Sequence, residues 1–383
     1  LIINPRAPGD TYPFKGLAGV GVAYKLGLAV SRKREIPRRV ISEVLEFVAI
    51  GTIADIMPLL DENRSFVKYG LKWINRGCRN PGLRRLIELS GLDCRNLTAT
   101  NVSFGIAPRI NAAGRVGDAD LGVKLFLAEK PDEIENYCRT MIERNNLRKQ
   151  WQEEAYRQCI VKARQEYRKG NFLLIEAKDV HEGILGIVAG KIKEEAKRPT
   201  VIVAPNGDEY KGTGRSVNRY RDCFLRFGGH KAACGFTVEP DRIESLRQNL
   251  NRDLAEMLEK DPALFEDEIT YDLDLEPDEV SLELAEALRC FEPCGKDNEA
   301  PKFRITYVMP ENWHFLKNDT KYARFQIGDL DCVLFHDAKR YFDMMQNHEF
   351  LDVYGTLDIN TWRDTRKVQL MVTEMAPTED FVG

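Results

Sequence analysis

The stretch HEGILGIVAGKIKEEAKRPTVIV (His181–Val203) decides the fold, together with GTGRSV (Gly212–Val217) and FGGHKAACGF (Phe227–Phe236) after it. Apolar Phe172–Ile175 precedes it as a short buried strand. Apolar residues then recur at helical spacing until Pro199, and a second buried strand follows. The order predicts a small α/β unit built as strand–loop–helix–strand–loop.

Three glycine-rich loops, each carrying histidine or arginine, are expected to gather at one end of this unit, where open α/β sheets bind ligands. Glycines expose backbone N–H groups to a ligand. Arg215 can donate two hydrogen bonds to a phosphate, and Thr213 and Ser216 add hydroxyls. Taken singly, a GxGR string is more often only a turn, and a GGH triplet only a tight bend.

The order of the motifs favours the functional interpretation. HxGIxGIVA, RPxxV, GxxRS and GGHxxAxGF follow one another as in the DHHA1 domain of the DHH phosphoesterase superfamily, and the chain resembles the RecJ family within it. The likeness runs nearly end to end. It is also carried by YPFKGLAGVGVAYKL, GTIADIMPL, FGIAPRINAAGR, ERNNLRKQ, EPCGKDNEAPKF and NTWRDTRKVQLMV.

Composition sets broad limits. A chain of 383 residues can form two or three domains, and no apolar run is long enough to span a bilayer. A net charge of −4 argues mildly against a nucleic-acid binder, but charge is unevenly spread, acidic over Glu259–Glu286 and basic over Arg139–Lys169. Nine scattered cysteines and the absence of a signal peptide fit reduced thiols, so we expect structural cysteines in a cytoplasmic protein.

Asp55 is a carboxylate among apolar neighbours in GTIADIMPLL, a costly setting unless it is paired, hydrogen-bonded or bound to a metal. The simpler interpretation is an N-cap or an Asx turn. The segment Asp61–Arg64 after it is interpreted as a solvated turn.

Two arginines and an amide stand among small residues in FGIAPRINAAGR. Arg109, Asn111 and Arg115 suit a surface that faces phosphates. Ion pairs with nearby acids such as Asp118 are an equally good explanation.

A long amphipathic helix over 131–168 is predicted to join two domains. Its basic residues either line a nucleic-acid path or form a solvated helix face; they are Arg144, Arg148, Lys149, Arg157 and Arg164.

From Phe303 onward the pattern alternates as in β-strands, with five strands and a helix before the fourth, which is OB-fold order. Four aromatic residues, interleaved with lysines and arginines, suit base stacking: Trp313, Tyr322, Phe325 and Trp362. About half of these four are expected to lie in the core instead. OB domains that bind small molecules or proteins are the alternatives.

The resemblance implies two divalent ions, Mn²⁺ or Mg²⁺, that activate a water against a phosphodiester. It makes Asp55 a metal ligand and assigns Arg109, Asn111 and Arg115 to phosphate. It places Thr213, Arg215 and Ser216 at a 5′-phosphate and GGH near the scissile nucleotide. The residues so implied for catalysis are Asp55, His230 and Arg109; those for nucleic acid also include His181, Gly228, Gly229, His230 and Trp362.

Two departures from the family pattern stand out. The string DHH is absent, so we expect a fragment that begins inside the DHH domain and holds one metal ligand. Ser216 and Phe227 are also closer together than in the family, where another helix intervenes.

The expected fold is α/β, with a partial DHH domain (1–130), a connecting helix (131–168), a DHHA1 domain (169–258), an acidic connector (259–300) and an OB-fold barrel (301–378). The expected function is 5′→3′ hydrolysis of single-stranded DNA to mononucleotides in repair and recombination, by a monomer whose fragment binds DNA but cleaves it poorly. The resemblance implies a single-strand-binding protein and a helicase as further partners. The alternatives are a non-catalytic nucleic-acid-binding relative and an oligoribonuclease or cyclic-dinucleotide phosphodiesterase.

Overall fold

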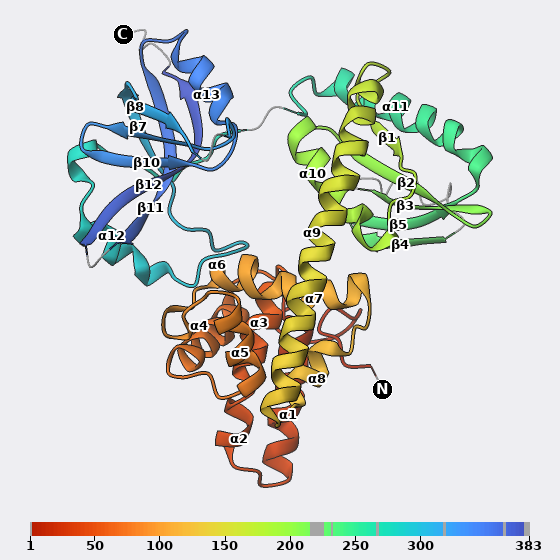
Figure 1. Cartoon of the computed structure of the whole chain (residues 1–383), viewed down its shortest axis with the longest axis vertical. Coiled ribbons are helices and arrows are strands. Elements are labelled where there is room, and N and C mark those ends of the chain that lie inside the picture. The colour runs from red at the N-terminus through yellow and green to blue at the C-terminus, as the bar shows by residue number, and fades with distance from the viewer. Residues whose placement is uncertain are drawn as a thin grey trace. The chain divides into compact units, whose positions relative to one another are not determined.

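The computed structural model describes residues 2–214, 226–230, 233–265, 268–316, 319–362 and 365–378. The chain forms two compact units (Figure 1). The first unit comprises Leu1–Ile74, Thr98–Thr100 and Glu268–Gly383; the second comprises Asn75–Leu97 and Asn101–Asp267. The domain boundaries expected from the sequence remain a prediction.

Helices open the first unit: α1 (Gly19–Lys33), α2 (Arg38–Ser42), α3 (Leu45–Ala54) and α4 (Asp61–Asn75). Helix α3 is apolar almost all round and is therefore buried. At Gly70 of α4, an added Cβ would lie 2.4 Å from the Leu45 carbonyl oxygen, so glycine lets the two helices approach closely.

The side chains of α1 are mostly half-buried or exposed. One expectation for this region was wrong. Asp61–Arg64 is not a turn but the first turn of α4, where acidic side chains are favoured by the helix dipole.

A seven-stranded sheet completes the first unit, in the order β6-β7-β11-β12-β10-β9-β8. Its strands are β6 (Leu273–Asp274), β7 (Phe303–Val308), β8 (Glu311–Phe315), β9 (Ala323–Ile327), β10 (Leu330–Leu334), β11 (Leu351–Trp362) and β12 (Thr365–Pro377). The five predicted strands and helix α13 (Ala338–Met345) are present, whereas β6 and β8 were missed. The described sheet has two edges, so the expected closed barrel is not observed. Between β6 and β7 the chain forms three short helices, η5 (Pro277–Glu279), α12 (Leu282–Ala287) and η6 (Leu288–Phe291).

The second unit begins with a helical cluster: α5 (Pro81–Leu89), η1 (Cys94–Asn96), the π-helical turn η2 (Val102–Ile106), α7 (Ala107–Val116) and α8 (Leu121–Leu127). The three-residue α6 (Ala99–Asn101) has its first two residues in the first unit and Asn101 in the second. The predicted long helix is α9 (Pro131–Tyr167), and its first half packs on α5, α7 and α8 (Figure 1). The second half of α9 continues along α10 (Glu182–Ala196) and β1 (Leu173–Glu176).

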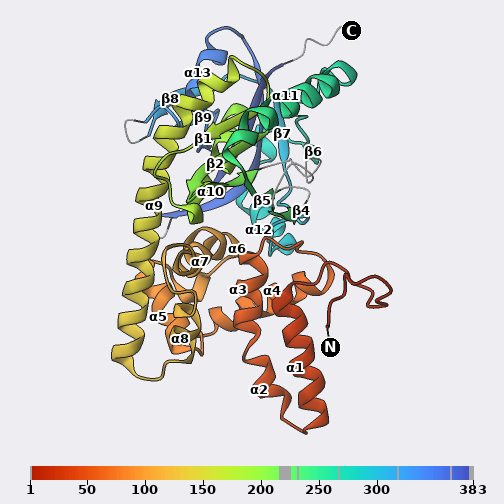
Figure 2. The same cartoon turned by 90° about the vertical axis from the view of Figure 1, so that its right-hand side faces the viewer.

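A five-stranded sheet in the order β1-β2-β3-β5-β4 forms the rest of this unit (Figure 1), and Figure 2 shows α9 running beside it. The other strands are β2 (Thr200–Asn206), β3 (Glu209–Gly214), β4 (Arg226–His230) and β5 (Ala233–Val238). Strands β1 and β2 are apolar on both faces, because α9 and α10 cover one face and α11 (Ile243–Lys260) covers the other. The helix η4 (Pro240–Arg242) leads into α11.

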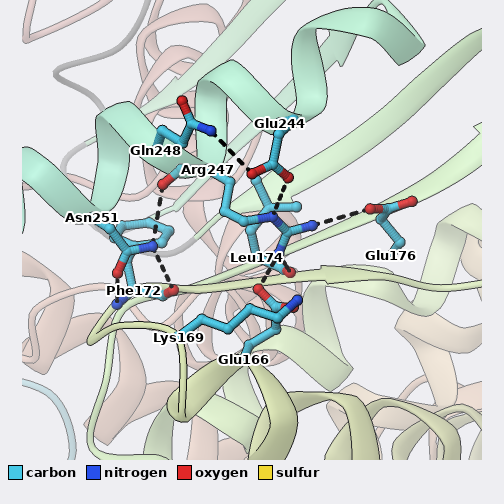
Figure 3. A network of polar contacts seen from close by, with 9 residues as sticks. All are labelled: Glu166, Lys169, Phe172, Leu174, Glu176, Glu244, Arg247, Gln248 and Asn251. Carbon is cyan, nitrogen blue, oxygen red and sulfur yellow. Dashed lines mark hydrogen bonds and ion pairs between the residues drawn. The ribbon is translucent and has the colours of Figure 1, made fainter.

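Arg247 of α11 forms hydrogen bonds and ion pairs with residues of α9 and β1 (Figure 3). Its side chain is 11% exposed and pairs with Glu166, which is 10% exposed. The guanidinium also donates to the Leu174 carbonyl oxygen at 2.8 Å and to Glu176 at 3.1 Å. A buried charge is tolerated here because every side of it has an acceptor.

No described helix is long and apolar enough to cross a membrane. Eight of the nine cysteines fall in the described residues, and none of these eight forms a disulfide bond there. Cys223 lies outside the described residues.

Candidate nucleic-acid interface

The PRINAAGR string forms helix α7, which follows directly from the π-helical turn η2. Asn111 and Arg115 are one turn apart and both exposed, so they share a face. Arg109 is half-buried, donates to the Gly105 carbonyl oxygen, and has a buried Nε without a partner in the described structure. Burial lowers the pKa of Arg109.

Arg109 and Arg115 do not pair with Asp118. That carboxylate instead binds the Lys124 ammonium group at 2.6 Å, and this hydrogen bond lowers its pKa. The ion-pair alternative from the sequence is therefore wrong for Asp118.

Arg115 reaches the beginning of helix α10. Its Nη1 donates to the Gly183 carbonyl oxygen at 3.0 Å. A Cβ added at Gly183 would lie only 2.6 Å from the carbonyl oxygen of Arg115, so the two backbones meet closely at this point. His181 is the N-cap of α10, with Nδ1 accepting from the Gly183 N–H at 3.1 Å.

The long helix α9 supplies a third side to this junction. The Trp151 ring lies 5.1 Å, centroid to centroid, from the His181 ring. Arg148, one turn earlier, is half-buried; it donates to the side-chain oxygens of Gln152 and Asn145 at 3.0 and 3.1 Å. Its Nε is buried without a partner in the described structure.

The strand register brings GTG and GGH together. Thr213 of β3 lies opposite Gly235 of β5, which lies opposite Gly228 of β4, so the three form one row across the sheet. GGH therefore lies in an edge strand and not in a loop as expected. The Thr213 hydroxyl donates to the Cys234 carbonyl oxygen at 3.1 Å.

The sequence predicted that the three motifs gather at one end of the sheet, and this prediction was wrong. Strands β3 and β4 run antiparallel to β1 and β2. Gly214 and His230, the last residues of β3 and β4, therefore lie at the end of the sheet opposite to the β1–α10 loop. Helix α10 bridges them, since Gly186 packs near the Thr213 hydroxyl. Arg215 and Ser216 lie outside the described residues. So does most of the segment between Ser216 and Phe227, where the resemblance implies another helix. Gly229 and His230 are described only as part of the backbone of β4.

Asp55 is neither buried nor an N-cap. It is the exposed C-cap of α3, with its N–H donating to the Gly51 carbonyl oxygen at 3.0 Å. The next residue, Ile56, is 71% exposed with φ of 51°, a conformation that is strained for a β-branched side chain. Leu59 fixes the following loop, because its N–H donates to the Lys296 carbonyl oxygen at 2.8 Å.

A divalent ion needs several oxygen or nitrogen ligands. Within the described ranges, no group of three His, Cys, Asp or Glu residues is arranged to hold a metal. Asp55 is accessible and fits a single ligand position. The described residues do not by themselves form the metal site that the resemblance implies, so no reaction step is assigned to a metal here.

The C-terminal sheet offers a second surface. A pocket of about 670 Å³ is lined by Arg324, Asp331, Asn360, Thr365, Lys367, Val368 and Gln369. Of the predicted stacking residues, Phe325 is buried in the core, Trp313 stacks on it, and Tyr322 is partly buried. The side chain of Trp362 lies outside the described structure.

Sequence reasoning assigned no individual role to Arg148 or Gly183, although both lie in strings that carry the resemblance. Gly183 is the first glycine of HxGIxGIVA, and Arg148 stands in ERNNLRKQ, where Asn145 precedes it by three residues and so faces it on a helix.

Two family models match the chain. The DHHA1 domain matches residues 169–256, and the RecJ OB domain matches residues 271–374.

Curated relatives match over nearly the whole chain. The single-stranded-DNA-specific exonuclease RecJ of Salmonella typhimurium is 32% identical over 98% of the chain and 70% of its own length. The same-named protein of Bacillus subtilis is 30% identical over 99% of the chain and 49% of its own length.

Solved structures show the same likeness. RecJ from Thermus thermophilus in complex with Mn²⁺ matches with a TM-score of 0.77 and 27% identity, over 97% of the chain and 55% of that structure. An exonuclease RecJ bound to manganese matches 65% of the chain with a TM-score of 0.54 and 32% identity. The chain thus spans between about half and 70% of these proteins.

Proposed function

The chain belongs to the RecJ family of single-stranded-DNA-specific exonucleases, and from this premise we propose that it serves metal-dependent hydrolysis of single-stranded DNA from the 5′ end, releasing mononucleotides. The supporting observation is the junction of α7 with α10. It presents Arg115 beside the N-terminus of α10, with no carboxylate of the described structure paired to it. Such a surface attracts phosphodiesters.

We attribute the proposed preference for the 5′ end to strands β3, β5 and β4 of the DHHA1 sheet. We propose that Thr213, together with Arg215 and Ser216, binds a 5′-phosphate. The row from Thr213 through Gly235 to Gly228 spans two interstrand spacings, about 10 Å, which is a suitable reach from a terminal phosphate toward the next phosphodiester. Because Gly235 and Gly228 have no side chains, single-stranded DNA can lie close to the protein backbone along this row.

Three residues are proposed to act in catalysis: Asp55, His230 and Arg109. Arg109 has a half-buried guanidinium with an unused Nε donor, which suits charge stabilisation on a phosphate. Asp55 is proposed as one ligand of a divalent ion, Mn²⁺ or Mg²⁺. The solved relatives that bind these two ions support this assignment.

The C-terminal sheet is proposed as a separate contact surface for single strands. Arg324 and Lys367 in its pocket carry the charge for backbone contacts, and the Nε of Arg324 is buried without a partner among described atoms. A single-strand-binding protein and a helicase are proposed as partners, to be tested by co-purification with the intact protein.

The deciding experiment follows nucleotide release in Mn²⁺ from single strands labelled at the 5′ or the 3′ end. It is run on this chain and on the longest protein that its gene encodes. Early release of the 5′ label by the longer protein, abolished by Asp55→Asn, is expected. Binding without release by the longer protein would instead favour a non-catalytic nucleic-acid-binding relative. Preference for RNA dinucleotides would favour an oligoribonuclease.

A further inference from the structure

Arg148 of α9 holds a positive charge that no described carboxylate neutralises. Its two hydrogen bonds go to the neutral amides of Asn145 and Gln152, at 3.1 and 3.0 Å. Asn145 is 1% exposed, so the guanidinium is held in a fixed orientation. Its Nε remains a buried donor with no acceptor in the described structure.

Arg115 lies at the same junction. Its guanidinium donates to the Gly183 carbonyl oxygen at 3.0 Å, and the ring of His181, two residues before Gly183, lies 5.1 Å from the ring of Trp151, which follows Arg148 by three residues. Burial and the nearby Arg115 guanidinium both lower the pKa of Arg148. Two like charges near each other, one exposed and one half-buried, repel unless an anion joins them.

The acids on the neighbouring elements are already engaged. Asp118, after α7, binds Lys124, and Glu182, in the first turn of α10, binds Lys211. Arg144 adds a third guanidinium, which donates to the Asp118 carbonyl oxygen at 3.3 Å and lies against Gly117. The Asp118 and Glu182 carboxylates are therefore not ion-paired with Arg115 or Arg148 in the described structure.

We propose that Arg148 and Arg115 together hold one phosphate of the bound single strand, so that the connecting helix is part of the binding site and not only a link. This inference rests on the proposed function and adds a residue to its site. Arg115 approaches the phosphate from α7, and Arg148 offers its free Nε and pre-oriented guanidinium from α9. A fork of N–H donors matches a phosphate in a way that a lysine does not.

The test compares Arg148→Met with Arg139→Met in the whole chain. Methionine keeps much of the aliphatic stem, and Arg139 lies on the same helix but is 64% exposed and paired with Glu135 at 2.6 Å. Anisotropy of a labelled, 5′-phosphorylated oligothymidine is measured over a range of salt in EDTA, which prevents hydrolysis. Arg148→Met is expected to weaken binding about tenfold and to make the salt slope less negative by about 0.7. Arg139→Met is expected to change neither by more than twofold.

Thermal unfolding separates this role from a structural one. Arg148→Met removes a repulsion but also removes the hydrogen bond to the buried Asn145 amide, so the two effects oppose each other and the melting temperature is expected to stay within about 5 °C of the wild type. Inorganic pyrophosphate at constant ionic strength is expected to raise the melting temperature of the wild type and not of the variant. In a double mutant, Arg115→Met is expected to cost less when Arg148 is already replaced, because both arginines serve one phosphate.

Equal binding and equal salt slopes for Arg148→Met and Arg139→Met would overturn the inference, as would a melting temperature of Arg148→Met lowered by more than about 5 °C with no anion effect. A wild-type chain with no salt-sensitive binding would overturn the proposed function itself. The two failures are thus distinguishable.

Discussion

Gly183→Ala tests the junction on which the proposed interface rests. The new Cβ would lie 2.6 Å from the Arg115 carbonyl oxygen, about 0.8 Å short of the 3.4 Å at which ordinary contact begins. A backbone oxygen in helix α7 cannot move aside alone, so α7 and α10 must separate at this point. The hydrogen bond from Arg115 to the Gly183 carbonyl oxygen, 3.0 Å long, is then weakened.

Two opposing effects set the magnitude. Overpacking of this kind costs about 1–3 kcal/mol, and the strained hydrogen bond costs about 1 kcal/mol more. Alanine gains up to about 1 kcal/mol over glycine in a helix. We therefore expect Gly183→Ala to lower the free energy of unfolding by about 1–3 kcal/mol, and to weaken single-strand binding because Arg115 is displaced.

Gly186→Ala is the matched control in the same helix. Its Cβ would lie 3.5 Å from the Thr213 hydroxyl, an ordinary contact, so helix propensity should leave its stability equal or higher. Urea unfolding followed by circular dichroism measures both variants. If Gly183→Ala proves as stable as Gly186→Ala and binds DNA like the wild type, the close approach of α7 and α10 is refuted.

Three further changes test other parts of the structure. Arg247→Ala should cost about 1.5–3 kcal/mol, because the buried Glu166 loses its charged hydrogen bond from Arg247 and keeps only the ion pair with Lys169. Arg247→Met with Glu166→Met should recover much of that loss in urea unfolding, and additive losses would contradict a paired charge. Burial acts to raise the pKa of Glu62, but hydrogen bonds from Lys25 and Tyr12 outweigh it and hold the pKa below its ordinary value. The stability that Glu62 contributes is therefore present above its unfolded pKa and is lost as pH falls through its folded pKa. Glu62→Gln should make the free energy of unfolding less dependent on pH on the acid side, and an unchanged dependence would argue against these contacts. Gly212→Ala would place a Cβ 2.2 Å from the Phe236 ring and should destabilise the sheet, whereas Gly212→Ala combined with Phe236→Leu should be partly rescued when thermal unfolding is compared.

The sequence by itself determined the elements whose signal is local. Apolar spacing gave the long helix now seen as α9, the helix α10 with its flanking strands, and five of the strands after Phe303, because periodicity of 3.6 or 2 residues reports the face that an element buries. It also carried the family resemblance, because short strings in a fixed order survive in a sequence without any knowledge of contacts.

Only the tertiary structure decided which charges remain unneutralised and which motifs are neighbours. Arg115 meets Gly183 across 68 positions of sequence. Arg148 differs from the other basic residues named on its helix because its Nε is buried without a partner among the described atoms and because Arg115 of α7 lies near it. The antiparallel course of β3 and β4 separates motifs that local patterns would place together. Strand direction and charge pairing depend on contacts between distant segments, and no local periodicity encodes them.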